Sequence, residues 1–300
     1  MNGDRLTPRA GFVLALGAFL IWGFMPLWFV HLRGLPAWEV VAHRVLWAVP
    51  FAIAVQWWRG RLSALPRLLD DRRTLALMVV PAVLIAVNWG VYVHAVDINR
   101  ASEAALGYYI TPILNVAMGA VLLRERLDGL QRAAIALVCA AVLWRIVGQG
   151  VFPWMGLALS TSFAVYGYMR KTLPVGPVEG FLIEVVLLSP VALVIVAFYG
   201  QAGVGAFGAT AQLTLLLVGS GVITAVPLIL FSFGAKALRL STIGLMGYVG
   251  PTLILIVSFT VLGEELETTD LVTFATIWTA LALYSASALR NADTSDATSA

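Results

Sequence analysis

The sequence predicts an all-α integral membrane protein whose ten transmembrane helices form two inverted five-helix repeats. Three observations carry this prediction. Charged residues make up 12% of the chain and hydrophobic residues 60%, whereas a soluble domain has about 25% charged residues because its surface faces water. Ten apolar stretches are long enough to cross a bilayer. The two halves of the chain also resemble each other in sequence.

The apolar stretches are spaced evenly, with short connections and no room for a soluble domain. A bilayer core about 30 Å thick needs about 20 helical residues. The expected spans are 10–30, 37–57, 74–95, 102–122, 128–147, 152–169, 177–199, 211–235, 241–262 and 269–289. The first is too long to be a cleaved signal peptide. The tail, residues 291–300, is small and polar and is expected to be disordered.

The cations predict the orientation, because loops rich in Lys and Arg stay in the cytoplasm. With both termini cytoplasmic, the outer segments hold only Arg33, Arg100 and Arg145, and Arg44 lies within a span. The inner segments then hold Arg5, Arg9, Arg59, Arg61, Arg67, Arg72, Arg73, Arg124, Arg126, Arg132, Arg170, Lys171, Lys236, Arg239 and Arg290. We therefore expect a multi-pass protein of a bacterial inner membrane with both termini inside.

The internal repeat relates residues 10–147 to residues 152–289. At a shift of 139 residues, Tyr109 aligns with Tyr248 and Pro112 with Pro251. Further matches are Glu125 with Glu264, Glu39 with Glu179 and Pro50 with Pro190. Because each repeat contains five spans, an odd number, the second must have the opposite orientation to the first, as in many transporters.

Several motifs resemble a known family. The segments EVVAHRVLW (39–47), NWGVYVHAV (88–96), EAALGYYITP (103–112) and LRERLDGLQ (123–131) are similar to the RarD-type branch of the EamA family. In the second half, ITAVPLILF (223–231) and LSTIGLMGYVGPT (240–252) agree with it. The segment DINRASEA (97–104) departs somewhat from the sequence that is usual for the family at this place. This resemblance to the drug/metabolite transporter superfamily implies ten helices, inverted repeats and a transport role often associated with drug or chloramphenicol resistance.

Two charged residues lie inside expected spans, where an ionisable side chain is costly and therefore a functional hypothesis. Arg44 and Glu184 align at a shift of 140 residues and enter their spans from opposite faces. We expect both to line a central cavity and bind substrate. Structural roles remain open: Arg44 could snorkel outward or pair with Glu39, and Glu184 could pair with a neighbouring hydroxyl.

Polar aromatic residues complete the expected substrate site. Asn88 and Tyr92 are four residues apart, hence on one helix face, with Trp89 beside them. Asn88 could instead join helices by hydrogen bonds. Tyr109 and Tyr248 each precede a proline by three residues, and Pro112 and Pro251, expected near mid-span, are candidate hinges. The weaker candidates are Ser162, Tyr166, Tyr168 and Thr224.

These features predict a secondary transporter, an exporter of a small amphipathic drug or metabolite that works by alternating access. A membrane sensor or scaffold and an intramembrane enzyme are the alternatives. The HExxH and Walker motifs are absent, so we expect no enzyme activity, no metal and no cofactor. The expected partners are the lipid bilayer and the substrate, with no nucleic acid and no required oligomer. Proton coupling and facilitated diffusion are both compatible with the sequence.

Overall fold

The computed structural model describes residues 7–62, 71–122, 128–149, 152–173, 175–238, 246–265 and 267–297. Within those ranges the chain forms ten α-helices and no strand. The helices are α1 (Pro8–Phe29), α2 (Ala37–Trp58), α4 (Arg72–Asp97), α5 (Ala101–Leu122), α6 (Gly129–Gln149), α7 (Trp154–Thr172), α8 (Pro177–Gln201), α9 (Ala211–Ala237), α11 (Val249–Thr260) and α12 (Thr268–Ala297). A short 3-10 helix, η1 (Val30–Leu32), follows α1.

Side-chain caps define where several helices begin. Thr7 caps α1 and is followed by a proline in the first turn, where the missing N–H costs nothing. Asp71 caps α4 by accepting hydrogen bonds from the backbone of Arg73 and Thr74. The hydroxyl of Thr74 also donates to it, and these bonds lower the pKa of the Asp71 carboxyl. Thr210 caps α9 in the same way as Thr7.

Five of the described helices are long and apolar enough to cross a membrane. They are Arg9–Leu32, Ala37–Trp58, Arg72–Asp97, Pro177–Gln201 and Ala211–Gly234. Their surfaces fit a lipid environment, because large apolar side chains such as Val194 (69% exposed) and Phe198 (66% exposed) point outward. The all-helical prediction is confirmed, and the apolar helices are those of a membrane protein.

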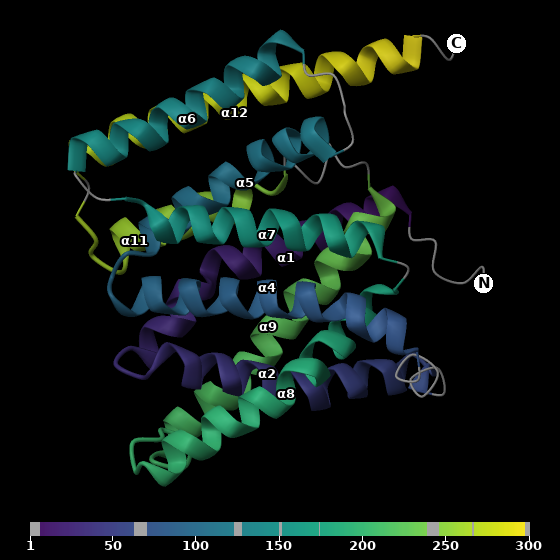
Figure 1. The fold of residues 1–300 in the computed structure, drawn as a ribbon, viewed down its shortest axis with the longest axis vertical. Coiled ribbons are helices and arrows are strands. Elements are labelled where there is room, and N and C mark those ends of the chain that lie inside the picture. The colour runs from purple at the N-terminus through teal and green to yellow at the C-terminus, as the bar shows by residue number, and fades with distance from the viewer. Residues whose placement is uncertain are drawn as a thin grey trace.

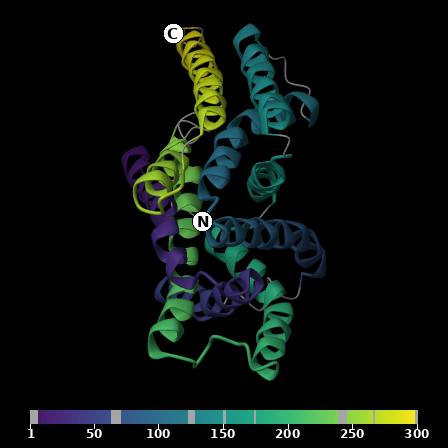
Figure 2. The ribbon, with the colours of Figure 1, turned by 90° about the vertical axis from the view of Figure 1, so that its left-hand side faces the viewer.

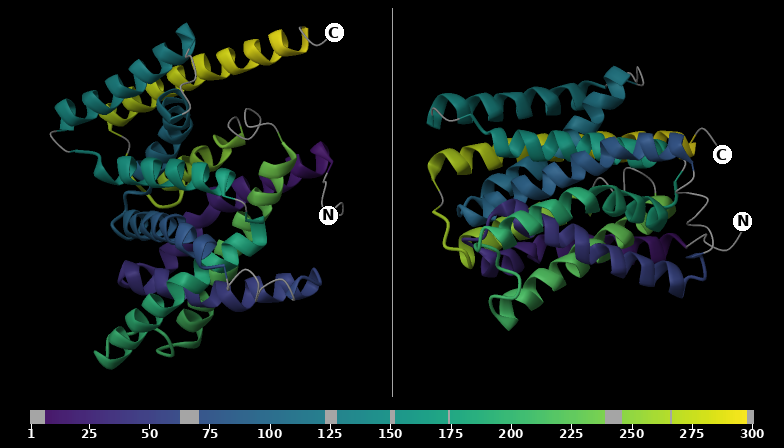
Figure 3. Two further views of the ribbon diagram at one scale, coloured as in Figure 1. Left: turned by 45° about the vertical axis from the view of Figure 1, so that its right-hand side comes forward. Right: turned by 60° about the horizontal axis from the view of Figure 1, so that its bottom comes forward.

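The helices run broadly alongside one another in a stack (Figure 1). In its centre α1 packs on α9 and α11, α5 packs on α7 and α11, and α4 packs on α7 and α8. α2 lies against α8 and α9 at one edge of the stack, and α6 pairs with α12 at the other (Figures 1 and 2). The beginning of α1 and the end of α12 lie on the same side of the stack (Figures 1 and 3). A chain that crosses a membrane an even number of times has both of its ends on the same side.

Two expectations differ from the structure. α12 continues as helix to Ala297 instead of becoming disordered after residue 290, because no proline or glycine in 291–297 stops it. Residues 298–300 lie outside the described residues. Pro251 is the third residue of α11 rather than a mid-helix kink, because a turn at 247–248 precedes that helix and a first-turn proline is tolerated. Pro112 does lie in the middle of α5.

Two glycines allow α5 and α7 to cross closely. A Cβ atom on Gly107 would lie 2.5 Å from the backbone oxygen of Gly156. We therefore expect Gly107→Ala to lower the thermal unfolding temperature in detergent, because the backbones must separate at a cost of about 1–3 kcal/mol. Gly167→Ala on α7 is the matched control, since no atom outside its own helix lies within 4 Å of the added Cβ. Equal unfolding temperatures for the two variants would contradict this account of the crossing.

Candidate functional site

Arg44 is a fully buried cation on α2, with 1% of its surface exposed. Its Nε donates a hydrogen bond of 2.9 Å to Oγ1 of Thr224 on α9. The guanidinium carbon lies 4.8 Å from the ring centroid of Phe29 on α1 and 4.9 Å from that of Trp89 on α4. Four helices therefore converge on this side chain, and two aromatic faces stabilise its charge by cation–π interactions.

The charge of Arg44 has no counter-ion among the residues that the structure describes. Its Nη1 is buried without a hydrogen-bond partner. Neither structural alternative holds: the side chain is buried instead of snorkelling outward, and Glu39 accepts a 2.7 Å hydrogen bond from the backbone N–H of Ala206. An uncompensated buried charge is costly, which is why such groups are typically functional.

Asn88 connects α4 to two other helices. Its Nδ2 donates to the backbone oxygen of Leu159 at 3.0 Å and to the hydroxyl of Ser162 at 2.9 Å, both on α7. Its Oδ1 accepts from the hydroxyl of Tyr108 on α5 at 3.0 Å. Asn88 therefore joins helices by hydrogen bonds, as one of its two expected roles requires. The bond to Tyr108 also holds that ring in place.

Tyr92 lies on the same face of α4 as Asn88, and it packs against Phe29, which also contacts Arg44. Its ring packs against Phe29 at 5.9 Å and Tyr108 at 6.2 Å between centroids. Its hydroxyl is buried and without a hydrogen-bond partner in the described part of the chain. We call Phe29, Arg44, Trp89, Tyr92 and Tyr108 the arginine cluster.

Glu184 belongs to a different group. Its Oε2 accepts a 3.2 Å hydrogen bond from the Tyr166 hydroxyl, and its Oε1 lies 3.6 Å from Nε of Arg170. Both partners are on α7. Arg170 also donates from Nη2 to the backbone oxygen of Pro177 at 3.0 Å. The neighbouring hydroxyl considered as a structural partner is present, and a buried ion pair accompanies it.

Tyr109 and Tyr248 meet where α5 packs on α11. Their rings are 6.5 Å apart and nearly parallel, with an interplanar angle of 28°. The Tyr109 hydroxyl shares a 2.6 Å hydrogen bond with Thr252. Pro112 and Pro251 follow these tyrosines in their helices and are both buried. The predicted pair is therefore brought together, at a place separate from the arginine cluster.

A row of aromatic rings connects the arginine cluster with the Glu184 group. Tyr108 contacts Phe163 at 6.0 Å, and Phe163 contacts Tyr166 at 6.1 Å between ring centroids. Trp22 on α1 also packs against Phe163, at 6.1 Å. The arginine cluster and the Glu184 group thus lie along one continuous aromatic path.

Sequence reasoning missed Phe29 and Tyr108. Phe29 carries no signal, since one apolar residue at the end of a span resembles any other. Tyr108 was passed over for its neighbour Tyr109, which had the repeat match. Three of the weaker candidates contact a primary one directly: Thr224 binds Arg44, Ser162 binds Asn88, and Tyr166 binds Glu184.

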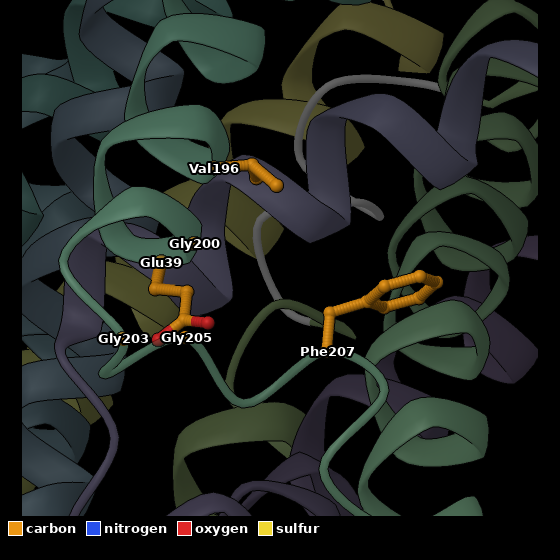
Figure 4. A pocket seen from close by; sticks show the side chains of 6 residues that line it. All are labelled: Glu39, Val196, Gly200, Gly203, Gly205 and Phe207. Carbon is orange, nitrogen blue, oxygen red and sulfur yellow. The ribbon is translucent and has the colours of Figure 1, made fainter.

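A cavity of about 280 Å³ lies beside the start of α2 (Figure 4). It is lined by Glu39, Val196, Gly200, Gly203, Gly205 and Phe207. The imidazole of His43, one turn after Glu39, stacks on Phe207 at 5.0 Å. A second cavity of about 350 Å³ is apolar and adjoins α8 near Phe198. Neither cavity is lined by an expected site residue.

Apolar helices surround a buried cation that has no counter-ion in the part of the chain that the structure describes. This is the arrangement of a multi-pass membrane protein with a polar interior, as membrane transporters have. Comparisons with known proteins agree. Residues 9–146 match the EamA-like transporter family. An uncharacterised transporter of Pseudomonas aeruginosa is 38% identical over 292 residues, covering 94% of this chain and 95% of that protein. Protein RarD of Escherichia coli is 37% identical over 282 residues, covering 94% of this chain and 95% of its own length.

The chain belongs to the EamA-like transporter family and is of the RarD type. A solved crystal structure also has a similar fold, with a TM-score of 0.63 at 18% identity, covering 94% of this chain and 99% of the other. The protein is therefore a multi-pass membrane transporter of the inner membrane.

Proposed function

We propose that this protein is a secondary transporter that exports a small amphipathic drug or metabolite by alternating access between two inverted repeats. The arginine cluster forms the substrate site, and Tyr109, Tyr248, Pro112 and Pro251 belong to the moving contact between α5 and α11. The observation that carries the proposal is Arg44, a buried cation at the meeting point of four helices with no counter-ion among the described residues.

Reciprocal helix packing supports the inverted repeats. A twofold axis that exchanges the halves would pair α1 with α7, α2 with α8, α4 with α9, α5 with α11 and α6 with α12. The packing of α1 on α9 then corresponds to that of α7 on α4, and α5 on α7 to α11 on α1. Three pairs of equivalent helices pack directly on each other: α2 on α8, α5 on α11 and α6 on α12.

Two matched glutamates support the same axis. Glu39, near the start of α2, accepts a hydrogen bond from Ala206 just beyond the end of α8. Glu179, near the start of α8, lies 4.0 Å from Arg59 and 3.6 Å from Arg61, just beyond the end of α2. Each glutamate thus ties the start of its own helix to the end of the equivalent one, as inversion requires.

The orientation has both termini in the cytoplasm, on the strength of the cation distribution. A cysteine at Ala209, between α8 and α9, should then react with an impermeant thiol reagent applied to intact cells, in a background with Cys139 replaced. A cysteine at Thr172, at the end of α7 on the opposite side of the membrane, should react only after lysis. Both residues are exposed. The reverse labelling pattern would contradict the orientation.

A metabolomic comparison tests the transport itself. Cells that overexpress the protein and cells that lack it should differ in a defined set of small molecules in the medium, and vesicles with the purified protein should move members of that set. A sensor or scaffold predicts no flux in purified vesicles. The direction of the difference in the medium tests export: compounds that rise on overexpression support it, and compounds that fall contradict it.

A further inference from the structure

The arginine cluster has an unbalanced charge. In the described part of the chain, Glu39 accepts a hydrogen bond from the backbone of Ala206, and Glu184 contacts Arg170 and Tyr166. The cluster contributes one positive charge and no negative one. An anion from outside the chain would offset the cost of such a cation in a membrane interior.

The geometry of Arg44 leaves one edge of the guanidinium for that anion. Phe29 and Trp89 occupy positions over the guanidinium within 5 Å of its carbon, and Thr224 takes Nε. Nη1 remains without a partner in the described structure. The ring of Tyr92, whose hydroxyl also has no partner there, packs against the same Phe29 ring. A planar carboxylate is the group that accepts hydrogen bonds from a guanidinium edge in parallel, with the phenol as a further donor.

The number of cations limits the charge of the ligand. One guanidinium balances a single negative charge, whereas a phosphate dianion would leave a net buried charge. The body of the ligand meets aromatic rings, because Tyr108 and Phe163 continue from the cluster toward Tyr166. Glu184, already paired with Arg170, is not free to bind a substrate amine.

We propose that the transported compound is an aromatic or similarly apolar monocarboxylate, whose carboxylate binds Arg44 and Tyr92 and whose ring packs along Tyr108 and Phe163. This inference rests on the proposed transport function and narrows its substrate from an amphipathic compound of any charge to an organic monoanion.

Thermal unfolding of the purified full-length protein tests the binding. The probes are benzoate, phenylacetate and indole-3-acetate, compared with neutral benzamide, cationic benzylamine and sodium chloride at equal ionic strength. At least one carboxylate should raise the unfolding temperature, because a ligand that binds only the folded state stabilises it. Benzamide, benzylamine and chloride should give no comparable shift. Protection by chloride alone, by benzylamine equally, or by none of the three carboxylates would overturn the proposal.

Substitutions locate the site. Arg44→Met should weaken carboxylate binding by at least about tenfold, the contribution of a charge-assisted pair. Arg9→Met, which removes an exposed cation at the start of α1, should leave it unchanged. Should Arg44→Met fail to fold, Arg44→Lys and Tyr92→Phe provide the readout, and both should reduce the shift. Carboxylate protection equal to that of the parent protein in these variants contradicts the assignment.

Flux measurements separate this inference from the transport proposal. Vesicles containing the protein should exchange labelled forms of whichever carboxylate protects it. Carboxylate binding that depends on Arg44 without any flux refutes transport and leaves the anion site standing. Flux of neutral or cationic compounds that survives Arg44→Met refutes the anion site and leaves transport standing.

Discussion

Replacing Glu184 with glutamine should destabilise the protein strongly. The carboxylate and its partner Arg170 are both largely shielded, with side-chain exposures of 1% and 12%. Removing one member of a buried pair leaves an uncompensated charge, at a cost of about 3–5 kcal/mol. We expect a large fall in the thermal unfolding temperature in detergent and a reduced yield of folded protein. Glu265→Gln, at an exposed glutamate, should change neither.

The double variant Glu184→Gln, Arg170→Gln tests the cause of that loss. Because it removes both charges together, it should recover much of the stability lost by Glu184→Gln alone. An additive result, in which the double variant is less stable than either single one by the sum of their effects, would mean that the two charges do not depend on each other.

Hydropathy was sufficient to predict most of the helices. The first eight spans agree with α1 to α9 to within a few residues at most ends, because an apolar run of that length has few other stable conformations in a membrane. The end of α12 was missed because a polar composition was taken as disorder, although nothing in 291–297 stops a helix. The expected span 241–262 begins with residues 241–245, which lie outside the described residues, and α11 begins only at Val249, after a turn at 247–248.

The partners of the buried charges were harder to predict than the charges themselves. Arg170 was counted with the loop cations, yet it lies four residues after Tyr166 and therefore on the same face of α7. That spacing could have identified it as a partner for Glu184. Glu39 and Arg44 are five residues apart, which places them on different sides of α2, and this argues against pairing between them.

Arg44 and Glu184 align in sequence at a shift of 140 residues, but the two have different surroundings. Glu184 has a cation and a hydroxyl beside it, so its charge is balanced within the chain. Arg44 has aromatic rings and a threonine, and no carboxylate in the described ranges balances its charge. The aligned positions therefore hold a carboxylate in an ion pair and a buried cation without a counter-ion among the described residues. The difference predicts opposite consequences for neutralising the two residues.

Replacing Arg44 with methionine should abolish transport while keeping the protein folded. Methionine fills a similar apolar space, and the loss of an uncompensated buried charge offsets the loss of the hydrogen bond to Thr224. The unfolding temperature should therefore stay near that of the parent protein or rise, as happens when a costly functional group is removed. The compounds whose concentrations in the medium depend on overexpression should return to the levels of cells without the protein.

Arg44→Lys distinguishes charge from geometry in the same assay. Lysine retains the positive charge but lacks the planar edge that matches a carboxylate, so it should restore transport only in part. Arg9→Met should transport at the parental rate, since it removes an equal charge from an exposed position. Measuring stability and transport together is decisive. Arg44→Met should be stable and inactive, and Glu184→Gln should be unstable. A stable Arg44→Met variant that still moves the same compounds would assign Arg44 a structural role and exclude the arginine cluster as the substrate site.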